Sequence, residues 1–327
     1  MLAALLAAAL FPTHVTVPFP GAARVAIAAG RVIAASESGM GAVIEGSRIV
    51  STFAAGSHPS SIAVADLDGD GNLDLAIANH EQKSLTLAFG HSFARTVQVA
   101  VPEVTPHLHS VAAADLDGDG KVDLVLNDMG GRRVLILWGN GDGTFSAPTA
   151  APTGSKGYAY LDVAVLRDRL FVPSWPEAQL AVLHVQKRTV TAQALLELPN
   201  PAFYAVAIGS DIAVATYSGT TADRSRDGIV LLRGGRGPAQ PFPGGPAPTS
   251  LAAGDVNGDG IADLAVCNQG GNAVTLLLGS ADGFKPGATL EALRPQGVAM
   301  GDLDGDGKAD IAIAGGDQVN VFLTRSK

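Results

Sequence analysis

Apolar residues in this chain recur at alternate positions in short runs, which is the periodicity of β-strands rather than of helices. Clear examples are residues 75–78 (Leu-Ala-Ile-Ala) and 311–314 (Ile-Ala-Ile-Ala), where a large aliphatic side chain alternates with alanine. Since both kinds of position are apolar, we expect these strands to be covered on both faces, with the small side chains on the tighter face. The 40 glycines and 19 prolines indicate many turns between the runs.

Four copies of one acidic loop, Asp-x-Asp/Asn-Gly-Asp-Gly-x-x-Asp, stand between such runs and divide the chain into repeats. Their first aspartates are residues 66, 115, 255 and 302, so the loops start 49, 140 and 47 residues apart. The middle interval is close to three periods, and two strand pairs without an acidic loop, at residues 161–172 and 205–215, fall inside it. A similar pair at residues 24–34 opens the chain. The chain therefore contains seven units, three of them without the acidic loop.

Each unit continues with two further strands, which in the second unit are residues 85–89 and 96–99. Four strands per unit with a period near 47 residues predict an all-β fold, a seven-bladed β-propeller with four-stranded blades. The last unit lacks a fourth strand, whereas residues 13–18 form a spare strand ahead of the first unit. We therefore expect the N-terminal strand to join the last blade and close the ring, which removes open sheet edges. The expected blades, all in one domain of residues 11–327, lie near residues 22–55, 60–102, 109–150, 157–196, 202–243, 248–290 and 296–323 plus 13–18.

The acidic loops offer oxygen ligands at loop positions 1, 3, 5 and 9, with glycine at positions 4 and 6. Carboxylates this close repel one another unless a cation lies between them. Hard oxygen ligands in a flexible loop suit Ca²⁺, and the residue at position 7 could add its backbone carbonyl oxygen. An EF-hand is excluded because its loop needs a glutamate at position 12, where this chain has Ile77, Leu126, Val266 and Ile313. The candidate ligands of the four Ca²⁺ sites are Asp66, Asp68, Asp70, Asn72 and Asp74; Asp115, Asp117, Asp119, Lys121 and Asp123; Asp255, Asn257, Asp259, Ile261 and Asp263; and Asp302, Asp304, Asp306, Lys308 and Asp310.

Composition narrows the function classes. The 327 residues carry a formal net charge of −9, which argues against nucleic acid as a partner, and four Ca²⁺ ions would change that charge to −1. The single cysteine, Cys267, excludes an internal disulfide and occupies a small-residue position of its strand, so we interpret it as a small buried side chain. Residues 1–10 are an apolar run too short to span a bilayer, and Ala7-Ala8-Ala9 fits a signal-peptide cleavage site. We therefore expect a signal peptide at residues 1–10 and a secreted or periplasmic protein without a membrane span.

The acidic loop between apolar strands resembles the FG-GAP repeat, also called the VCBS-type repeat, of the integrin α-subunit N-terminal β-propeller superfamily. Residues 139–148 (Gly-Asn-Gly-Asp-Gly-Thr-Phe-Ser-Ala-Pro) are similar to the stretch that gives the repeat its name. The resemblance is strong over residues 56–150 and 246–327 and is limited to the fold over 22–55 and 157–240. It implies a seven-bladed propeller, often secreted, whose aspartate loops bind Ca²⁺ at the matching positions. It implies no single function, because such propellers serve adhesion, sugar binding and, less often, catalysis.

The strand order places the acidic loops at one end of the blades and the second-to-third and fourth-to-first connections at the other. By analogy with the family, we expect a structural role for Ca²⁺ and a ligand at the opposite end. That end should carry histidines that could bind a transition metal or be ordinary loop residues, aromatic rings that could stack on sugars, and arginines that could meet carboxylates. They are His58, His80, His107 and His109; Tyr158, Trp175, Tyr204 and Tyr217; and Arg132, Arg133, Arg224 and Arg226. The preferred ligand-binding candidates are Tyr217, Arg224, Arg226, Trp175, His107 and His109. The connection 217–227 is the candidate recognition loop, with a solvated insertion as the alternative.

No short catalytic motif is present: the chain has no Gly-x-Ser-x-Gly, no His-Glu-x-x-His and no phosphate-binding Gly-x-x-x-x-Gly-Lys. We therefore expect a Ca²⁺-stabilised extracellular module for binding or adhesion to a protein or carbohydrate. A polysaccharide-active lyase or hydrolase is the alternative, and it requires convergent carboxylates, or histidine with carboxylate, in one pocket with shifted pKa values. A purely structural repeat domain would show no concentrated surface patch.

Overall fold

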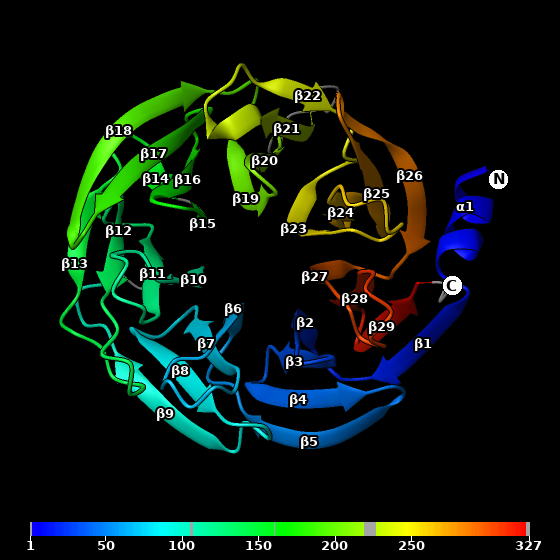
Figure 1. Ribbon diagram of the computed structural model, residues 1–327, viewed down its shortest axis with the longest axis horizontal. Coiled ribbons are helices and arrows are strands. Elements are labelled where there is room, and N and C mark those ends of the chain that lie inside the picture. Colours follow the sequence, from blue (N-terminus) through cyan, green and yellow to red (C-terminus); the bar gives the residue numbers. More distant parts are fainter. Residues whose placement is uncertain (1, 105–106, 160, 219–226, 325–327) are drawn as a thin grey trace. The chain divides into compact units, whose positions relative to one another are not determined.

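The alternating apolar runs form strands throughout the computed structural model, which describes residues 2–104, 107–159, 161–218 and 227–324. These strands assemble into seven antiparallel sheets that follow one another along the chain (Figure 1). Six of the sheets have four strands, and the seventh has four positions filled by five strands. The fold is therefore an all-β, seven-bladed β-propeller, which confirms the fold expected from the repeat period.

The chain divides into two compact units. The unit of Ser38–Met40 and Thr52–Ala205 carries three blades, and in its last blade two short strands, β14 and β15, both pair with β16 and replace a single first strand. The blades of this unit are β6 (Pro59–Ala65), β7 (Asp74–Asn79), β8 (Ser84–Phe89) and β9 (Arg95–Ala100); β10 (Val111–Ala114), β11 (Asp123–Asp128), β12 (Arg133–Leu137) and β13 (Thr149–Pro152); and β14 (Tyr158–Ala159), β15 (Ala164–Leu166), β16 (Arg169–Trp175), β17 (Gln179–Gln186) and β18 (Thr189–Glu197).

The other unit, Met1–Glu37, Gly41–Ser51 and Val206–Lys327, carries most of the remaining four blades. Its strands are β2 (Ala22–Ala28), β3 (Arg31–Ser36), β4 (Met40–Glu45) and β5 (Arg48–Ala54); β19 (Ala202–Ile208), β20 (Asp211–Thr216), β21 (Gly228–Leu232) and β22 (Gln240–Phe242); β23 (Pro248–Gly254), β24 (Asp263–Asn268), β25 (Ala273–Ser280) and β26 (Gly283–Glu291); and β27 (Pro295–Gly301), β28 (Asp310–Gly315), β29 (Gln318–Leu323) and β1 (Thr13–Pro18). Two 3₁₀ turns, Arg233–Gly235 and Gln269–Gly271, follow strands β21 and β24.

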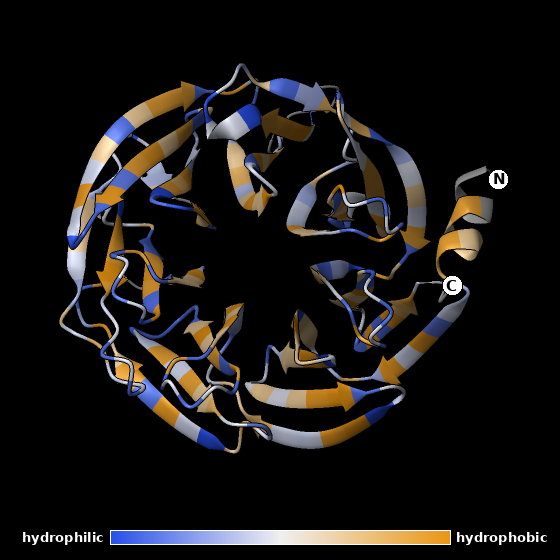
Figure 2. Ribbon diagram, viewed as in Figure 1, coloured by the Kyte–Doolittle hydropathy of each residue, from blue (hydrophilic) through white to orange (hydrophobic). Residues whose placement is uncertain are grey.

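The second strand of a blade is buried on both faces, as the alternation of large and small apolar residues predicts. Every residue of β7, β11, β24 and β28 is buried. The fourth strands differ, since β9 and β18 consist of exposed and partly buried residues, and Figure 2 shows both hydrophilic and hydrophobic colours along them. Cys267 lies on the buried β24 with no exposed surface, and burial raises the pKa of its thiol to about 12. It is therefore a small core residue, as the sequence indicated, and is not poised for reaction.

The N-terminal strand completes the last blade. Strand β1 pairs antiparallel with β29 from Thr13↔Leu323 to Pro18↔Gln318. Beyond the strand ends, a further hydrogen bond joins the two segments: the backbone N–H of Gly21 donates to the Asp317 side chain at 2.8 Å. On the same sheet, the His14 ring stacks on Phe322 with centroids 4.2 Å apart. The expected closure by residues 13–18 is thus confirmed.

The first ten residues form one short helix. Helix α1 (Leu2–Leu10) packs on β26, where Leu6, Ala7 and Leu10 contact a core cluster that includes Phe11 and Leu290. Among the described residues, no helix is long and apolar enough to cross a membrane. The helical conformation does not test the expected signal peptide.

Candidate metal loops and ligand surface

Each acidic loop is the connection between the first and second strands of its blade, and its ninth residue is the first residue of the second strand. In the second blade, β6 ends at Ala65, the loop follows, and Asp74 opens β7. The glycines at positions 4 and 6 adopt left-handed backbone conformations, with φ of +76° at Gly69 and +86° at Gly71. Only glycine takes these conformations without strain. They turn the backbone N–H groups of the loop inward.

The inward N–H groups bind the carboxylate at position 1. Gly69 donates to Asp66 Oδ1 at 2.8 Å and Gly71 donates to Asp66 Oδ2 at 2.9 Å. The same pair of hydrogen bonds recurs in the other three loops, on Asp115, Asp255 and Asp302. In all four loops the N–H of the position-7 residue also donates to the position-5 carboxylate; these residues are Asn72, Lys121, Ile261 and Lys308. The four loops therefore share one internal geometry.

The carboxylate at position 9 is fully buried and ties the loop to two strands. Asp74 Oδ2 accepts the N–H of Leu67 at 3.0 Å, and Asp74 Oδ1 accepts the N–H of Gly90 just after β8 at 2.9 Å. Its counterparts make the same two kinds of bond: Asp123 with Leu116 and Gly139, Asp263 with Val256 and Gly279, and Asp310 with Leu303 and Thr324. Burial raises the pKa of these four carboxyl groups, and raises that of Asp263 to about 6. Position 9 thus has a structural function in addition to any metal contact.

The remaining carboxylate oxygens converge in a way that fits a hard cation. One oxygen from each of Asp66, Asp68 and Asp70 lies within 4.8 Å of the others, and the same is true of Asp302, Asp304 and Asp306. In the third blade the converging set is Asp115, Asp117 and Asp123. Two of the oxygens, Asp68 Oδ1 and Asp306 Oδ2, are buried without a hydrogen-bond partner. A buried carboxylate oxygen without a donor is costly, and a coordinated cation would remove that cost.

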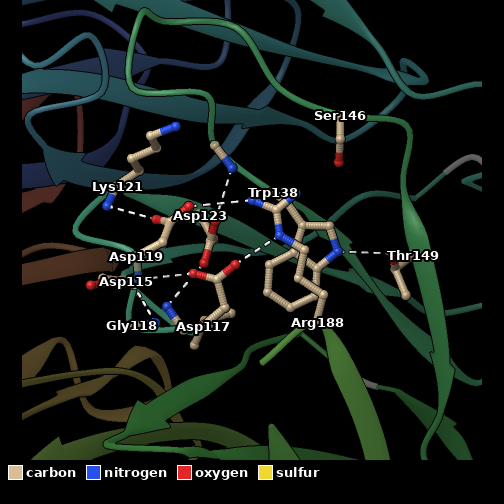
Figure 3. A network of polar contacts seen from close by, with 12 residues as sticks. Asp115, Asp117, Gly118, Asp119, Lys121, Asp123, Trp138, Ser146, Thr149 and Arg188 are labelled. Atoms are coloured by element: carbon tan, nitrogen blue, oxygen red, sulfur yellow. Dashed lines mark hydrogen bonds and ion pairs between the residues drawn. The ribbon is translucent and has the colours of Figure 1, made fainter. Parts of the chain in front are cut away.

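Arginines neutralise part of this charge in the first two loops, which the sequence did not reveal. Arg188, in the turn between β17 and β18, donates from Nε to Asp117 Oδ2 at 2.7 Å and contacts Asp119 at 3.3 Å (Figure 3). Although burial opposes it, this guanidinium holds the pKa of Asp117 below its ordinary value. Arg95 makes the same kind of pair with Asp68 at 2.8 Å. The other oxygen of Asp117 accepts the N–H of Asp119, whereas the other oxygen of Asp68 is buried without a hydrogen-bond partner.

One blade without an acidic loop keeps the aspartate of position 9, and sequence reasoning missed it. Asp211 is the first residue of β20, as Asp74 is of β7. Asp211 Oδ1 accepts the N–H of Gly234 just after β21, and Oδ2 pairs with Arg233 at 2.8 Å. The other two blades have Arg31 and Arg169 at the start of their second strands, both buried. An aspartate at the first position of a buried strand was the signal that could have identified this residue.

At the other end of the three-blade unit, aromatic and basic side chains gather into a patch. Tyr158 on β14 and Trp175 on β16 are paired across the sheet, with ring centroids 6.4 Å apart and planes 20° from parallel. The guanidinium of Arg132, in the β11–β12 turn, lies 5.7 Å from the Tyr158 ring centroid. Tyr158 is 38% exposed and Arg132 is exposed as well. We call these three residues the aromatic patch.

The other predicted ligand residues divide into four groups. His80, His107 and His109 come together, and His58 lies beside Glu81, 3.9 Å away. Arg133 is engaged by the buried Asp128 at 2.7 Å, so it has a structural role. Tyr204 and Tyr217 are half-buried on or after strands β19 and β20. Arg224 and Arg226, with most of the candidate recognition loop, lie outside the described residues.

Two cavities lie at the acidic-loop end of the other unit. One of about 240 Å³ is lined by Asp211, Arg233, Ile261 and Phe284, among others. A second of about 110 Å³ lies beside Leu303 of the fourth loop. Both are smaller than the roughly 300–1,000 Å³ of ordinary small-molecule sites. The carboxyl groups with raised pKa values are the four position-9 aspartates. Neither cavity brings two of them together.

Comparison with known proteins agrees with this geometry. A family model described as an FG-GAP-like repeat matches residues 66–126, 115–166 and 255–313. No curated protein sequence matches the chain. Among solved structures, a chain of Kuenenia stuttgartiensis hydrazine synthase superposes with a TM-score of 0.70 at 14% identity, covering 94% of this chain and 97% of that chain. BBS1N in complex with ARL6DN gives 0.68 at 13% identity, covering 97% and 98%, and the WD40 β-propeller domain of Doa1 gives 0.63 at 11%, covering 96% of each chain.

At these identities the structural likeness shows the fold alone, so the chain is a β-propeller with seven blades. Its particular kind follows from the family match, which falls on the acidic loops and the strands around them. The protein is an FG-GAP repeat β-propeller, as the sequence resemblance indicated.

Proposed function

We propose that this protein is a Ca²⁺-stabilised extracellular binding module whose ligand, a carbohydrate or a protein, contacts the ends of the blades opposite the acidic loops. The aromatic patch carries this proposal. An exposed tyrosine beside a tryptophan presents ring faces on which a sugar or a planar side chain can stack, and Arg132 adds a charge that can bind a carboxylate. Propellers of this fold commonly serve as binding modules.

The calcium part of the proposal rests on the donor set. Three of the four loops converge oxygens of three aspartates, and two buried oxygens have no hydrogen-bond donor. In the third loop, Asn257 provides an amide oxygen at position 3. When bound, Ca²⁺ would neutralise these clusters and stabilise the loops, while the chain's own N–H groups hold positions 1 and 9 in place. The ions are assigned a structural role, since the aromatic patch lies at the other end of the blades.

The calcium part is tested by thermal unfolding with Ca²⁺ and with excess chelator, together with metal counting. We expect about four Ca²⁺ per chain and a lower melting temperature after chelation, because a ligand that binds only the folded state stabilises it by mass action. Extracellular modules bind Ca²⁺ with dissociation constants of roughly 10⁻⁴–10⁻³ M, so the effect should appear at millimolar Ca²⁺. An unchanged melting temperature with no bound metal would refute the structural role of Ca²⁺.

The ligand part is tested by screening the Ca²⁺-loaded protein on an array of neutral and acidic oligosaccharides and titrating the best one. Replacing Tyr158 by alanine should weaken binding by about 30-fold, since truncating a central aromatic anchor costs about 2 kcal/mol or more. Tyr217→Ala is the comparison variant, because that tyrosine is the rival ligand candidate and lies on the other unit. A loss with Tyr217→Ala and none with Tyr158→Ala would move the ligand away from the aromatic patch. If the protein bound no oligosaccharide on the array, the carbohydrate proposal would be wrong. The same two variants would then be tested for binding to protein ligands.

The extracellular location rests on the apolar residues 1–10 with their Ala7-Ala8-Ala9 site. If the chain is expressed with its own N-terminus in a secreting host, the exported protein should have lost this segment. Mass spectrometry of the exported protein shows whether residues 1–10 have been removed. Recovery of only full-length protein inside the cell would contradict the proposal.

A further inference from the structure

Three histidines converge beside the second blade, far from the acidic loops. His80 follows the last residue of β7, whereas His107 and His109 lie in the connection between β9 and β10. One nitrogen from each ring lies within 4.8 Å of the other two. His107 Nδ1 and His80 Nε2 are only 3.3 Å apart. Because β7 separates His80 from Asp74 by six residues of extended chain, the histidines lie about 20 Å from the acidic loop of that blade.

The backbone holds the three histidines in this arrangement. The N–H of His107 donates to the carbonyl oxygen of His80 at 2.9 Å, which joins the two segments directly. The N–H of His109 donates at 3.2 Å to the side chain of Asn127, which has no exposed surface. Between them, Leu108 is fully buried and anchors the segment in the core. The positions of the rings therefore follow from main-chain and core contacts, which do not require a metal.

A left-handed backbone turn sets the position of the His107 ring. The φ of His107 is +90°, a region in which a side chain other than glycine is strained. The residues at the equivalent position of the other acidic-loop blades, His58, Ala247 and Arg294, also have positive φ, of +49°, +51° and +43°, so this turn belongs to the repeat. The conformation places the His107 ring against His80, with ring centroids 5.0 Å apart.

The geometry matches what a small tetrahedral metal ion requires. Metal–nitrogen distances of about 2.0–2.1 Å and tetrahedral angles put two ligand nitrogens about 3.3 Å apart. The His80–His107 pair already has this separation, and the third nitrogen needs to approach by at most about 1.5 Å. Neutral imidazole nitrogen suits Zn²⁺, Cu²⁺, Ni²⁺ and Co²⁺ and is a poor ligand for Ca²⁺, which selects oxygen.

We propose that His80, His107 and His109 form a binding site for a divalent transition-metal ion, with Zn²⁺ as the preferred probe. Three protein ligands leave a fourth coordination position, and because His107 is exposed that position faces solvent. A bound ion would join the β7–β8 turn to the β9–β10 connection and so clamp two successive blades of the same unit. The site does not depend on Ca²⁺ or on the ligand of the aromatic patch.

The test is a Zn²⁺ titration of the full chain against a chromophoric chelator, with excess Ca²⁺ present to occupy the acidic loops. We expect one Zn²⁺ per chain, together with a rise in melting temperature. The exposed His107 can be changed without disturbing the core, so His107→Gln should fold normally. It should weaken Zn²⁺ binding by at least tenfold, because even the outer partners of metal ligands change affinity by about 10–100-fold.

His91→Gln is the matched control, since His91 is exposed in the β8–β9 turn of the same blade. It should leave both Zn²⁺ affinity and the Zn²⁺-dependent melting temperature unchanged. His80→Gln provides a second variant, and Co²⁺ gives an independent readout through the absorption spectrum of a tetrahedral site. Equal Zn²⁺ binding by His107→Gln, His80→Gln and the unaltered protein would overturn the proposal, as would the absence of stoichiometric Zn²⁺ binding.

Discussion

A carboxylate can stabilise a loop without a metal, and the ninth position of each acidic loop does so. Asp74 is fully buried, yet each of its oxygens accepts one backbone N–H, from Leu67 and from Gly90. These bonds connect the loop to the strands on both sides of it. Burial raises the pKa of Asp74, and the hydrogen bonds from the two N–H groups lower it in part. Those two N–H groups in turn have Asp74 as their acceptor.

Substitutions in the presence of chelator separate this structural role from a metal-binding role. Asp74→Ala leaves two buried N–H groups without an acceptor and should lower the free energy of unfolding by about 2–6 kcal/mol. Asp70→Asn at the exposed fifth position keeps an oxygen for the Asn72 N–H and should change it by less than about 0.5 kcal/mol. Urea denaturation measures both values. If Asp70→Asn proved as destabilising as Asp74→Ala without metal, the two positions would not have the distinct roles assigned to them.

The sequence predicted the loop positions because repetition makes them visible. It could not predict the partners that come from distant strands. Arg188 lies 71 residues from Asp117, and only the packing of neighbouring blades brings them together. Tyr158 and Trp175 were both candidates, but their pairing depends on the register of β14 and β16, which apolar alternation does not specify. The grouping of three histidines also depends on two separate connections.

Among the elements, β1 is the strand that the chain start contributes to the last blade. It supplies the fourth strand of the last blade, covers the edge of β29 and is followed by Phe19, which is fully buried. The sequence predicted this pairing by counting strands, since one blade lacked a strand and one strand lacked a blade. The position of α1 on β26 was not predictable, because a short apolar run is consistent with a helix, a signal peptide or both.

Two truncations test the contribution of β1. A chain that begins at residue 20 loses β1 and Phe19, and burial of Val17 and Phe19 alone is worth about 3–6 kcal/mol. It should unfold at lower temperature and associate as concentration rises, because the edge of β29 is open. A chain that begins at residue 11 lacks only α1 and should remain monomeric with a smaller loss of stability. Thermal unfolding and analytical ultracentrifugation distinguish the two, and equal behaviour would contradict the role given to β1.

At the scale of the whole molecule, acidic charge is concentrated in four loops. The formal net charge is −9, and four Ca²⁺ ions would reduce it to −1. Without metal, the clustered carboxylates repel one another, and the arginines at Asp68 and Asp117 relieve only part of that repulsion. The stability of the metal-free protein should then depend on ionic strength.

Monovalent salt should therefore raise the melting temperature more in chelator than in Ca²⁺. Screening acts over about 10 Å at 0.1 M salt, so it reaches charges within one loop and around it. Differential scanning calorimetry over a series of NaCl concentrations gives the two slopes, and KCl serves as a control for specific ion binding. Identical slopes with and without Ca²⁺ would mean that loop repulsion does not limit the stability of the metal-free protein.

Asp211 shows that a blade can have the anchoring carboxylate without an acidic loop. Its connection from β19 has two residues, 209–210, where the second blade has eight, 66–73. The acidic loop is thus six residues longer than this short connection and lies just before an anchor that works without it. An engineer could therefore change the length of this connection in one blade without removing the carboxylate that anchors it. The number of acidic loops can therefore differ from the number of blades, as it does in this chain, which has four such loops and seven blades.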